Sequence, residues 1–197
     1  MSTYRIVVLA SGSGTLLQAL IDAQGTHEFE IVGLITDGEC AALTRASDAR
    51  IATKILSVGT NRDAWDELMA QTLHEFEPDL VVSAGFMRIL GDQVLHDWLG
   101  KIINTHPAML PLFPGAHAVR DAMAAGVATT GTTVHFIDAG VDTGEVIVQR
   151  EVDVYPHDTE HSLHERIKLV ERGLIVEVVK KFARGELSTK PKRVIAP

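Results

Sequence analysis

Asn104 and His106 stand two residues apart in a stretch that cannot be helical, because Pro107 follows directly and biases His106 toward an extended conformation. On an extended chain, side chains two residues apart point to the same side. The amide of Asn104 and a protonated imidazole at His106 could together hold an oxygen that gains negative charge. The pair therefore predicts carbonyl chemistry, and the alternative is that both side chains only bond loop backbone at a strand end.

Asp142 lies in a loop that we expect at the same edge of the molecule. A carboxylate beside an imidazole favours the protonated ring and fixes its tautomer. The chain has no Ser in a G-x-S-x-G motif, and Cys40 has no partner in view. An amide, an imidazole and a carboxylate would then act on a carbonyl without a protein nucleophile.

The segment SGSGT carries Gly12 and Gly14 after an apolar run and before a helical pattern. Such a loop can hold an anion on backbone N–H groups at a helix N-terminus. A dinucleotide fingerprint would need a third glycine where Leu17 stands, so a plain phosphate is favoured over a dinucleotide. The alternative is a tight turn without a ligand. No G-x-x-x-x-G-K-[ST] motif occurs.

His157, His161 and His164 have spacing that could align them on a helix as metal ligands. We expect Asp158 to cap that helix, which would leave His157 outside it. No thiolate or evident carboxylate completes the set. A solvated helix start is therefore preferred, and no metal is expected.

Strands and helices alternate along the chain. Short apolar, β-branched runs predict strands at Tyr4–Ala10, Glu30–Thr36, Thr53–Leu56, Leu80–Ser83 and Ile102–Thr105. Helical spacing predicts helices at Leu16–Ala23, Ala41–Arg50 and Arg62–Phe76 and a long one from Asp158 to about Arg184. Two further strands, Thr130–Ile137 and Val146–Val154, flank a Gly/Asp loop and suggest an antiparallel edge.

This order predicts a single Rossmann-like α/β domain over residues 1–197. Its twisted sheet would be mostly parallel, with helices on both faces and the antiparallel edge in the C-terminal half. Ligands of such sheets bind beyond the carboxyl ends of the strands. That rule selects four loops: Ser11–Thr15, Ala84–Leu90, Asn104–His117 and Asp138–Gly144.

Composition narrows the class of protein. The 197 residues are 46% hydrophobic with a formal net charge of −8, which argues against a general nucleic-acid surface. No apolar run approaches the roughly 18 residues of a membrane span, and the N-terminus does not resemble a signal peptide. A lone cysteine, Cys40, fits a reducing cytoplasm. We expect a cytoplasmic protein that acts on small molecules, without nucleic acid or membrane, and a homodimer is left open.

Four motifs resemble the phosphoribosylglycinamide formyltransferase family, whose members use 10-formyltetrahydrofolate in purine synthesis. They are SGSGTLLQ (11–18), GFMRIL (85–90), NTHPAMLPLFPGAH (104–117) and GTTVHFIDAGVDTG (131–144). The resemblance extends from Tyr4 to about Arg184. It departs at Leu16, where better-known members carry Asn, and at Ala108, where Ser is common.

The resemblance implies roles for individual residues. Asn104 and protonated His106 would stabilise the oxyanion, His106 would pass a proton toward the leaving N10, and Asp142 would keep His106 charged. His135 would support them or serve only as a structural strand histidine. The ribonucleotide would contact Gly14, Thr15, Leu16, Lys168, Leu169, Val170 and Glu171. The folate would contact Arg62, Met87, Arg88, Ile89, Leu90, Asn104, Asp138, Ala139, Gly140, Val141 and Asp142.

On a helical wheel Glu171 falls at the border of the apolar stripe, whereas Lys168 lies further round. The alternative for these two residues is an ordinary i,i+3 surface pair.

Three other functions share part of this pattern. A 10-formyltetrahydrofolate hydrolase would use the same three catalytic residues, with water as the acceptor, but usually has a further N-terminal domain. An initiator-tRNA formyltransferase would need a C-terminal domain and a basic surface. A non-catalytic nucleotide-binding module would explain Gly12 and Gly14 but would leave Asn104, His106 and Asp142 without a role.

Overall fold

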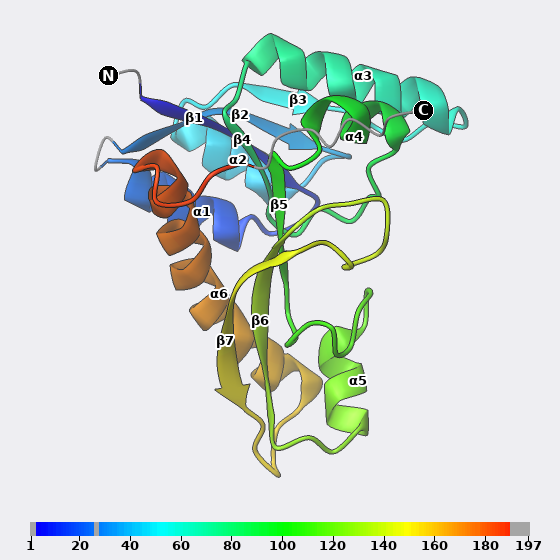
Figure 1. Cartoon of the computed structure of the whole chain (residues 1–197), viewed down its shortest axis with the longest axis vertical. Helices are drawn as coiled ribbons and strands as arrows, with labels where there is room; N and C mark the ends of the chain where they lie inside the picture. The colour runs from blue at the N-terminus through cyan, green and yellow to red at the C-terminus, as the bar shows by residue number, and fades with distance from the viewer. Residues whose placement is uncertain (1–2, 26–27, 190–197) are drawn as a thin grey trace.

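One seven-stranded sheet forms the centre of the computed structural model, which describes residues 3–25 and 28–189 (Figure 1). Its order is β3-β2-β1-β4-β5-β6-β7. The strands are β1 (Tyr4–Ala10), β2 (Phe29–Thr36), β3 (Thr53–Ile55), β4 (Leu80–Ser83), β5 (Ile102–His106), β6 (Thr129–Phe136) and β7 (Val146–Asp153). The helices are α1 (Thr15–Gln24), α2 (Ala41–Asp48), α3 (Arg62–Phe76), α4 (Asp92–Trp98), α5 (Ala118–Ala124) and α6 (Glu160–Ala183).

The sheet is parallel from β3 to β5 and antiparallel from β5 to β7. This confirms the predicted fold class, including the antiparallel edge. β5 and β6 run in opposite directions. Their register places β5 beside the C-terminal half of β6, from Thr133 to Phe136. That register pairs Asn104 directly with His135.

Two hydrophobic cores cover the two faces of the sheet. Ile6 and Val8 of β1 face a core with α1, α2 and α6, whereas Val7 and Leu9 face a core with α3 and α4. Figure 1 shows α1 and α6 on one side of the sheet and α3 and α4 on the other. Because both faces of β1 are covered, its sequence is almost continuously apolar.

The start of α6 differs from the prediction. Thr159, not Asp158, is the N-cap. Its hydroxyl accepts from the Ser162 N–H, and its own backbone N–H donates to the Ser162 hydroxyl in a capping box. Asp158 lies one residue earlier, where its carboxylate accepts from the Tyr155 N–H and from the Arg166 guanidinium. His157 lies outside α6 as expected and stacks on Tyr155.

Two short helices, α4 and α5, were not predicted. Each has seven residues, too few for a helical period to stand out from the sequence. The predicted helix Ala41–Arg50 ends at Asp48, and Arg50 takes a positive φ of 58°.

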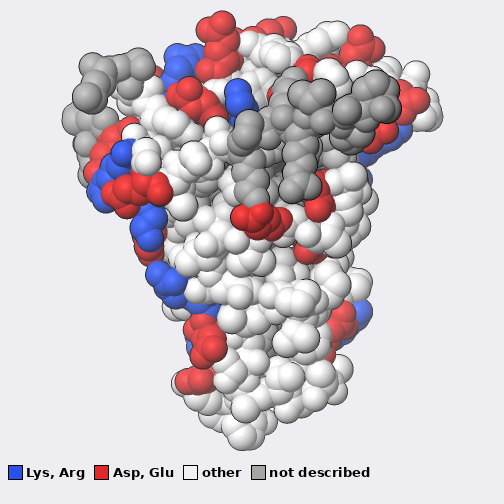
Figure 2. Space-filling model, in the orientation of Figure 1, with Lys and Arg blue, Asp and Glu red and all other residues white. Residues whose placement is uncertain are grey.

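The surface in Figure 2 carries Lys and Arg side chains among Asp and Glu, without a broad basic area on this face. Among the described residues, no helix is both long and apolar enough to cross a membrane. The same part of the chain holds no group of three or more His, Cys, Asp or Glu side chains placed to bind a metal ion.

Candidate active site

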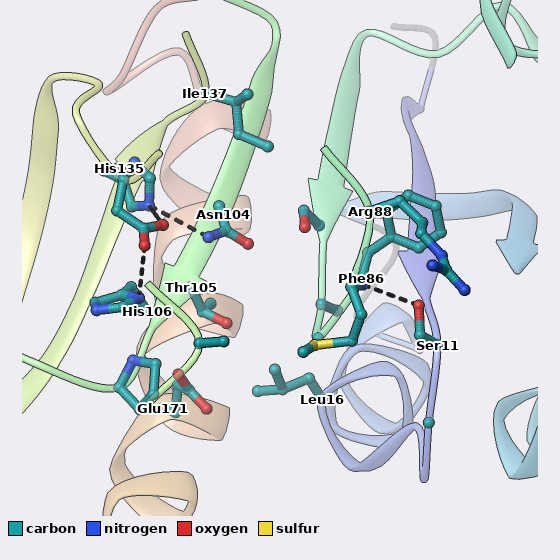
Figure 3. Close-up of a pocket in the computed structure, with 18 of the residues that line it drawn as sticks. Ser11, Leu16, Phe86, Arg88, Asn104, Thr105, His106, His135, Ile137 and Glu171 are labelled. Atoms are coloured by element: carbon teal, nitrogen blue, oxygen red, sulfur yellow. Dashed lines mark hydrogen bonds and ion pairs between the residues drawn. The ribbon is translucent and has the colours of Figure 1, made fainter. Parts of the chain in front are cut away.

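A cavity of about 520 Å³ lies beyond the carboxyl ends of β1, β4 and β5 (Figure 3). All four loops selected from the sequence contribute to its wall. The far wall is the N-terminal half of α6. The cavity is therefore where the parallel-sheet rule places a ligand.

His106 lies at the end of β5 with both ring nitrogens facing oxygen atoms. Its Nδ1 lies 3.3 Å from Oδ2 of Asp142, and its Nε2 donates to the Phe113 carbonyl at 2.8 Å. Neither oxygen can donate a hydrogen when Asp142 is ionised. The doubly protonated imidazolium is thus the form of His106 that satisfies both contacts.

Asp142 is ionised in this setting. A hydrogen bond from His135 is the largest effect that holds the pKa of Asp142 below its usual range, and the Gly115 N–H and the charge of His106 add to it against the opposing effect of burial. The Gly115 N–H donates to Oδ2 at 2.8 Å. Asp142 itself takes a positive φ of 54°, which turns its loop back toward the histidines.

His135 connects Asn104 to Asp142. Its Nδ1 carries a proton, because that atom lies 2.8 Å from the Phe136 carbonyl. Its Nε2 lies 3.3 Å from Nδ2 of Asn104 and 3.5 Å from Oδ1 of Asp142. A neutral ring accepts a hydrogen from the amide, and a protonated ring donates to the carboxylate. Figure 3 shows Asn104, His106 and His135 in one group.

The proline-rich loop after His106 is fastened to β6. The hydroxyl of Thr133 donates to the Ala108 carbonyl at 2.7 Å and accepts from the Leu110 N–H at 3.1 Å. The amide of Gln149 on β7 donates to the Leu110 carbonyl at 2.7 Å. These bonds hold the loop on the sheet at the point where it leaves His106.

The loop before α1 forms the opposite wall of the cavity. Gly14 is the N-cap residue in a left-handed conformation, with φ 68°. No side chain caps α1, and its first turn has no acidic residue. The first backbone N–H groups of α1 therefore have no acceptor within the helix, which is the arrangement that binds an anion.

Glu171 projects from α6 toward the cavity and is only 5% exposed. Burial raises the pKa of Glu171 to about 7, while the Thr132 hydroxyl, which donates to it at 3.2 Å, acts in the opposite direction. Lys168 also lines the cavity but pairs with Glu165 at 2.8 Å. The alternative of a surface pair between Lys168 and Glu171 is therefore wrong.

The loop from residue 84 to residue 90 gives the cavity an apolar rim. Met87 and Ile89 line it and are 67% and 65% exposed. The Arg88 guanidinium is turned to Asp37, with Nε and Oδ2 2.6 Å apart. Arg62 stacks on Trp65 and donates to the Ile89 carbonyl.

Most side chains predicted for the site line this one cavity, but four do not. Arg62 lies behind the rim and Ala139 does not line the cavity. Leu169 is 65% exposed, and Val170 packs against a third hydrophobic cluster, formed by Val119, Val152, Leu163 and Ile167. Three lining residues were missed outside the selected loops: Ser83, Ile137 and His164. His164 was assigned to a solvated helix start. Its i,i+4 and i,i+7 spacing to Lys168 and Glu171 was the available signal that it shares their face.

Comparison with known proteins agrees with this geometry. A model of the formyl transferase family matches residues 4–179. The chain belongs to the formyl transferase family. A phosphoribosylglycinamide formyltransferase of Mycobacterium tuberculosis is 50% identical over 182 residues, which cover 91% of this chain and 85% of that protein. The Escherichia coli protein of the same name is 38% identical, with 92% and 88% covered.

Solved structures of the formyl transferase family have the same fold. The glycinamide ribonucleotide transformylase 1 of Symbiobacterium toebii superposes with a TM-score of 0.91 at 36% identity, over 96% of this chain and 92% of that one. Membership of the family implies a folate-type formyl donor. The cavity volume of about 520 Å³ lies in the range of small-molecule sites.

Proposed function

We propose that the chain is a phosphoribosylglycinamide formyltransferase, which moves the formyl group of 10-formyltetrahydrofolate to the amino group of glycinamide ribonucleotide in purine synthesis. One observation carries this proposal. The cluster of Asn104, His106 and Asp142 shares its cavity with an uncapped helix N-terminus that suits a phosphate. A formyl acceptor with both an amine and a phosphate fits this cavity, because one wall can activate a carbonyl and the other can bind an anion.

The ribonucleotide would lie between α1 and α6. Its phosphate would bind backbone N–H groups of Gly14, Thr15 and Leu16, because the start of α1 favours negative charge. Its amine and ribose would face Glu171, with Lys168 beside them. A cationic amine favours the ionised carboxylate, so binding would draw the Glu171 proton off at neutral pH.

The folate would bind against the opposite rim. The rim formed by Met87, Ile89 and Val141 is apolar and exposed, and backbone groups of residues 88–90 and 138–142 lie next to it. A flat heteroaromatic ring needs such a surface, with a few polar groups to orient it. Arg62 would act by holding the Ile89 carbonyl rather than by lining the cavity.

In the reaction the amine nitrogen forms a bond to the formyl carbon while the bond from that carbon to N10 breaks. Asn104 and His106 would donate hydrogen bonds to the formyl oxygen as it gains negative charge. The amine attacks in its neutral form, after the bound cation has given a proton to water. The attacking nitrogen then loses one further proton and N10 gains one. His106 would give its proton to N10 and take up the proton that the amine releases. Asp142 would stay ionised and favour the charged ring of His106.

His106 must change one contact to act as this acid. Its Nε2 proton lies on the Phe113 carbonyl, and its Nδ1 faces Asp142. We propose that the bond to Phe113 opens when the substrates bind, while the contact with Asp142 persists. Phe113 has a positive φ of 54°, so its carbonyl direction depends on the turn formed by Pro111, Leu112 and Pro114.

We also propose that residues 1–197 form one formyltransferase domain that works on small molecules in the cytoplasm. The match to the family over residues 4–179 supports the first part. The free thiol of Cys40 suits a reducing compartment.

One assay tests the proposed function. The protein is mixed with 10-formyltetrahydrofolate, with and without glycinamide ribonucleotide, and release of tetrahydrofolate is followed. We expect release only when the ribonucleotide is present, together with formylated ribonucleotide as the product. Release without ribonucleotide would indicate a hydrolase, and no release in either mixture would contradict the proposal.

A further inference from the structure

Arg45 of α2 lies behind the anion-binding loop and, among the residues that the structure describes, donates hydrogen bonds to two neutral acceptors. Its Nε donates to the Ser13 carbonyl at 2.8 Å, and its Nη1 donates to Oε1 of Gln18 at 3.0 Å. Within the described part of the chain, no carboxylate forms an ion pair with Arg45. The positive charge next to the loop is therefore not held in an ion pair with a described acid.

The bond to Ser13 fixes the direction of the next N–H group. In a trans peptide the carbonyl of one residue and the N–H of the following residue point in opposite directions. The Ser13 carbonyl is turned to Arg45, so the Gly14 N–H points away from Arg45. Both residues line the cavity, and we infer from this that the Gly14 N–H faces the cavity.

The stem of Arg45 also packs against Gly14. A Cβ at residue 14 would lie 2.8 Å from Cα of Ala42 and 3.2 Å from Cδ of Arg45. The positive φ of Gly14 excludes most side chains as well. The loop conformation is thus set by contact with α2, and Arg45 is the charged part of that contact.

We propose that Arg45 is a positioning residue for the phosphate of the acceptor substrate, an inference that rests on the proposed function. It orients the Gly14 N–H and adds positive potential behind the first turn of α1. Leu16 offers no side-chain donor at this turn, so the charge of Arg45 adds to the backbone N–H groups at the start of α1. Arg45 does not line the cavity and acts through Ser13 and Gly14.

Three variants separate this role from a general structural one. Arg45→Met removes the charge and both hydrogen bonds, and Arg45→Lys keeps the charge but cannot form the same fork. Arg50→Met removes an equal charge from an exposed residue just beyond the same helix and serves as the control. KM for each substrate and kcat are measured for all three and for the unaltered protein.

We expect Arg45→Met to raise KM for glycinamide ribonucleotide roughly tenfold, with kcat and the folate KM within about twofold. KM for the ribonucleotide of Arg45→Lys should fall between that of Arg45→Met and that of the unaltered protein. Arg50→Met should have the same KM as the unaltered protein. The ribonucleotide KM of the unaltered protein should rise with salt more steeply than that of Arg45→Met. An unchanged ribonucleotide KM, or an equal rise in both KM values, would overturn the inference.

A binding measurement keeps this test separate from the assay of function. Inorganic phosphate is titrated into the unaltered protein and into Arg45→Met, and the 31P NMR line is followed. Weaker binding to the variant supports the role of Arg45 even if no formyl transfer is found, in which case only the proposed reaction fails. Equal binding to the two proteins, or none to either, contradicts the role of Arg45.

Discussion

Replacing Glu171 by Gln should stabilise the protein at alkaline pH and leave its stability unchanged in acid. The side chain is 5% exposed, and burial raises its pKa from 4.5 to about 7. Below pH 4.5 the carboxyl is protonated in the folded and the unfolded chain alike. Between pH 4.5 and 7 the unfolded chain ionises first, so the folded protein loses stability as the pH rises.

The size of the effect follows from the pKa difference. A rise of about 2.5 pH units corresponds to roughly 3 kcal/mol of lost stability above pH 7. Gln has the same shape, and its amide oxygen can still accept from Thr132. The melting temperature of Glu171→Gln should therefore exceed that of the unaltered protein by roughly 6–12 °C at pH 8, and the two should converge near pH 4.

The assay is thermal unfolding of both proteins from pH 4 to pH 8.5. Glu165→Gln is the matched control, because Glu165 lies on the same helix in a surface pair with Lys168, which lowers its pKa. Glu165→Gln should show no rise in melting temperature at alkaline pH. A melting-temperature difference for Glu171→Gln that stays constant with pH would show that the buried carboxyl does not ionise at a raised pKa. At pH 7 and above, Glu171→Gln should also raise KM for the ribonucleotide, because the carboxylate is lost.

Two further predictions concern the wall of the cavity. Leu16→Asn should lower KM for the ribonucleotide by adding a donor beside the phosphate, with kcat nearly unchanged in initial-rate kinetics. Because Leu16 is only 7% exposed, the free energy of unfolding should also fall by roughly 2–4 kcal/mol. Gly144→Ala should lower the free energy of unfolding by roughly 1–3 kcal/mol in denaturant unfolding and should also lower kcat. The added Cβ would collide with the Phe136 carbonyl, which holds His135. Gly59→Ala is the control and should change neither quantity, because the space at its Cβ is open. A changed kcat at constant KM for Leu16→Asn, or an unchanged kcat for Gly144→Ala, would count against these assignments.

The strong periodic elements were predictable from the sequence. The helix Arg62–Phe76 and the strands Tyr4–Ala10 and Leu80–Ser83 have the predicted bounds. Their apolar patterns are long or continuous, and polar or glycine residues limit them on both sides. The cap of α6 was assigned to Asp158 because Asp158 and Thr159 are both good caps, and only the hydrogen bonds to Ser162 decide between them.

The site was predictable as a set of loops but less so as a set of contacts. Ligands of parallel sheets bind beyond the carboxyl ends of the strands, and this rule together with the motifs predicted that Asn104, His106 and Asp142 lie at one edge of the sheet. The contact of His106 with the Phe113 carbonyl was not predictable, because it depends on a turn seven residues further along the chain. Arg62 lies behind the rim because stacking on Trp65 three residues later directs its guanidinium to Ile89.

Asp142 was expected to act on His106, and the structure adds that it also contacts His135. Local sequence gives no sign of this second contact, which arises from the pairing of His135 with Asn104 across β5 and β6. The role of Asp142 in the reaction therefore has to be separated experimentally from its role in holding His135.

A double-mutant cycle on the single-turnover rate shows whether Asp142 acts through His106 during formyl transfer. Single-turnover rates are measured for the unaltered protein, His106→Ala, Asp142→Asn and the double variant. Each single change should lower the rate about 10²- to 10⁴-fold. The double variant should lose little more than the worse single variant, because groups that act as a unit are not additive. If the two losses multiply, Asp142 does not act through His106 and the account is wrong.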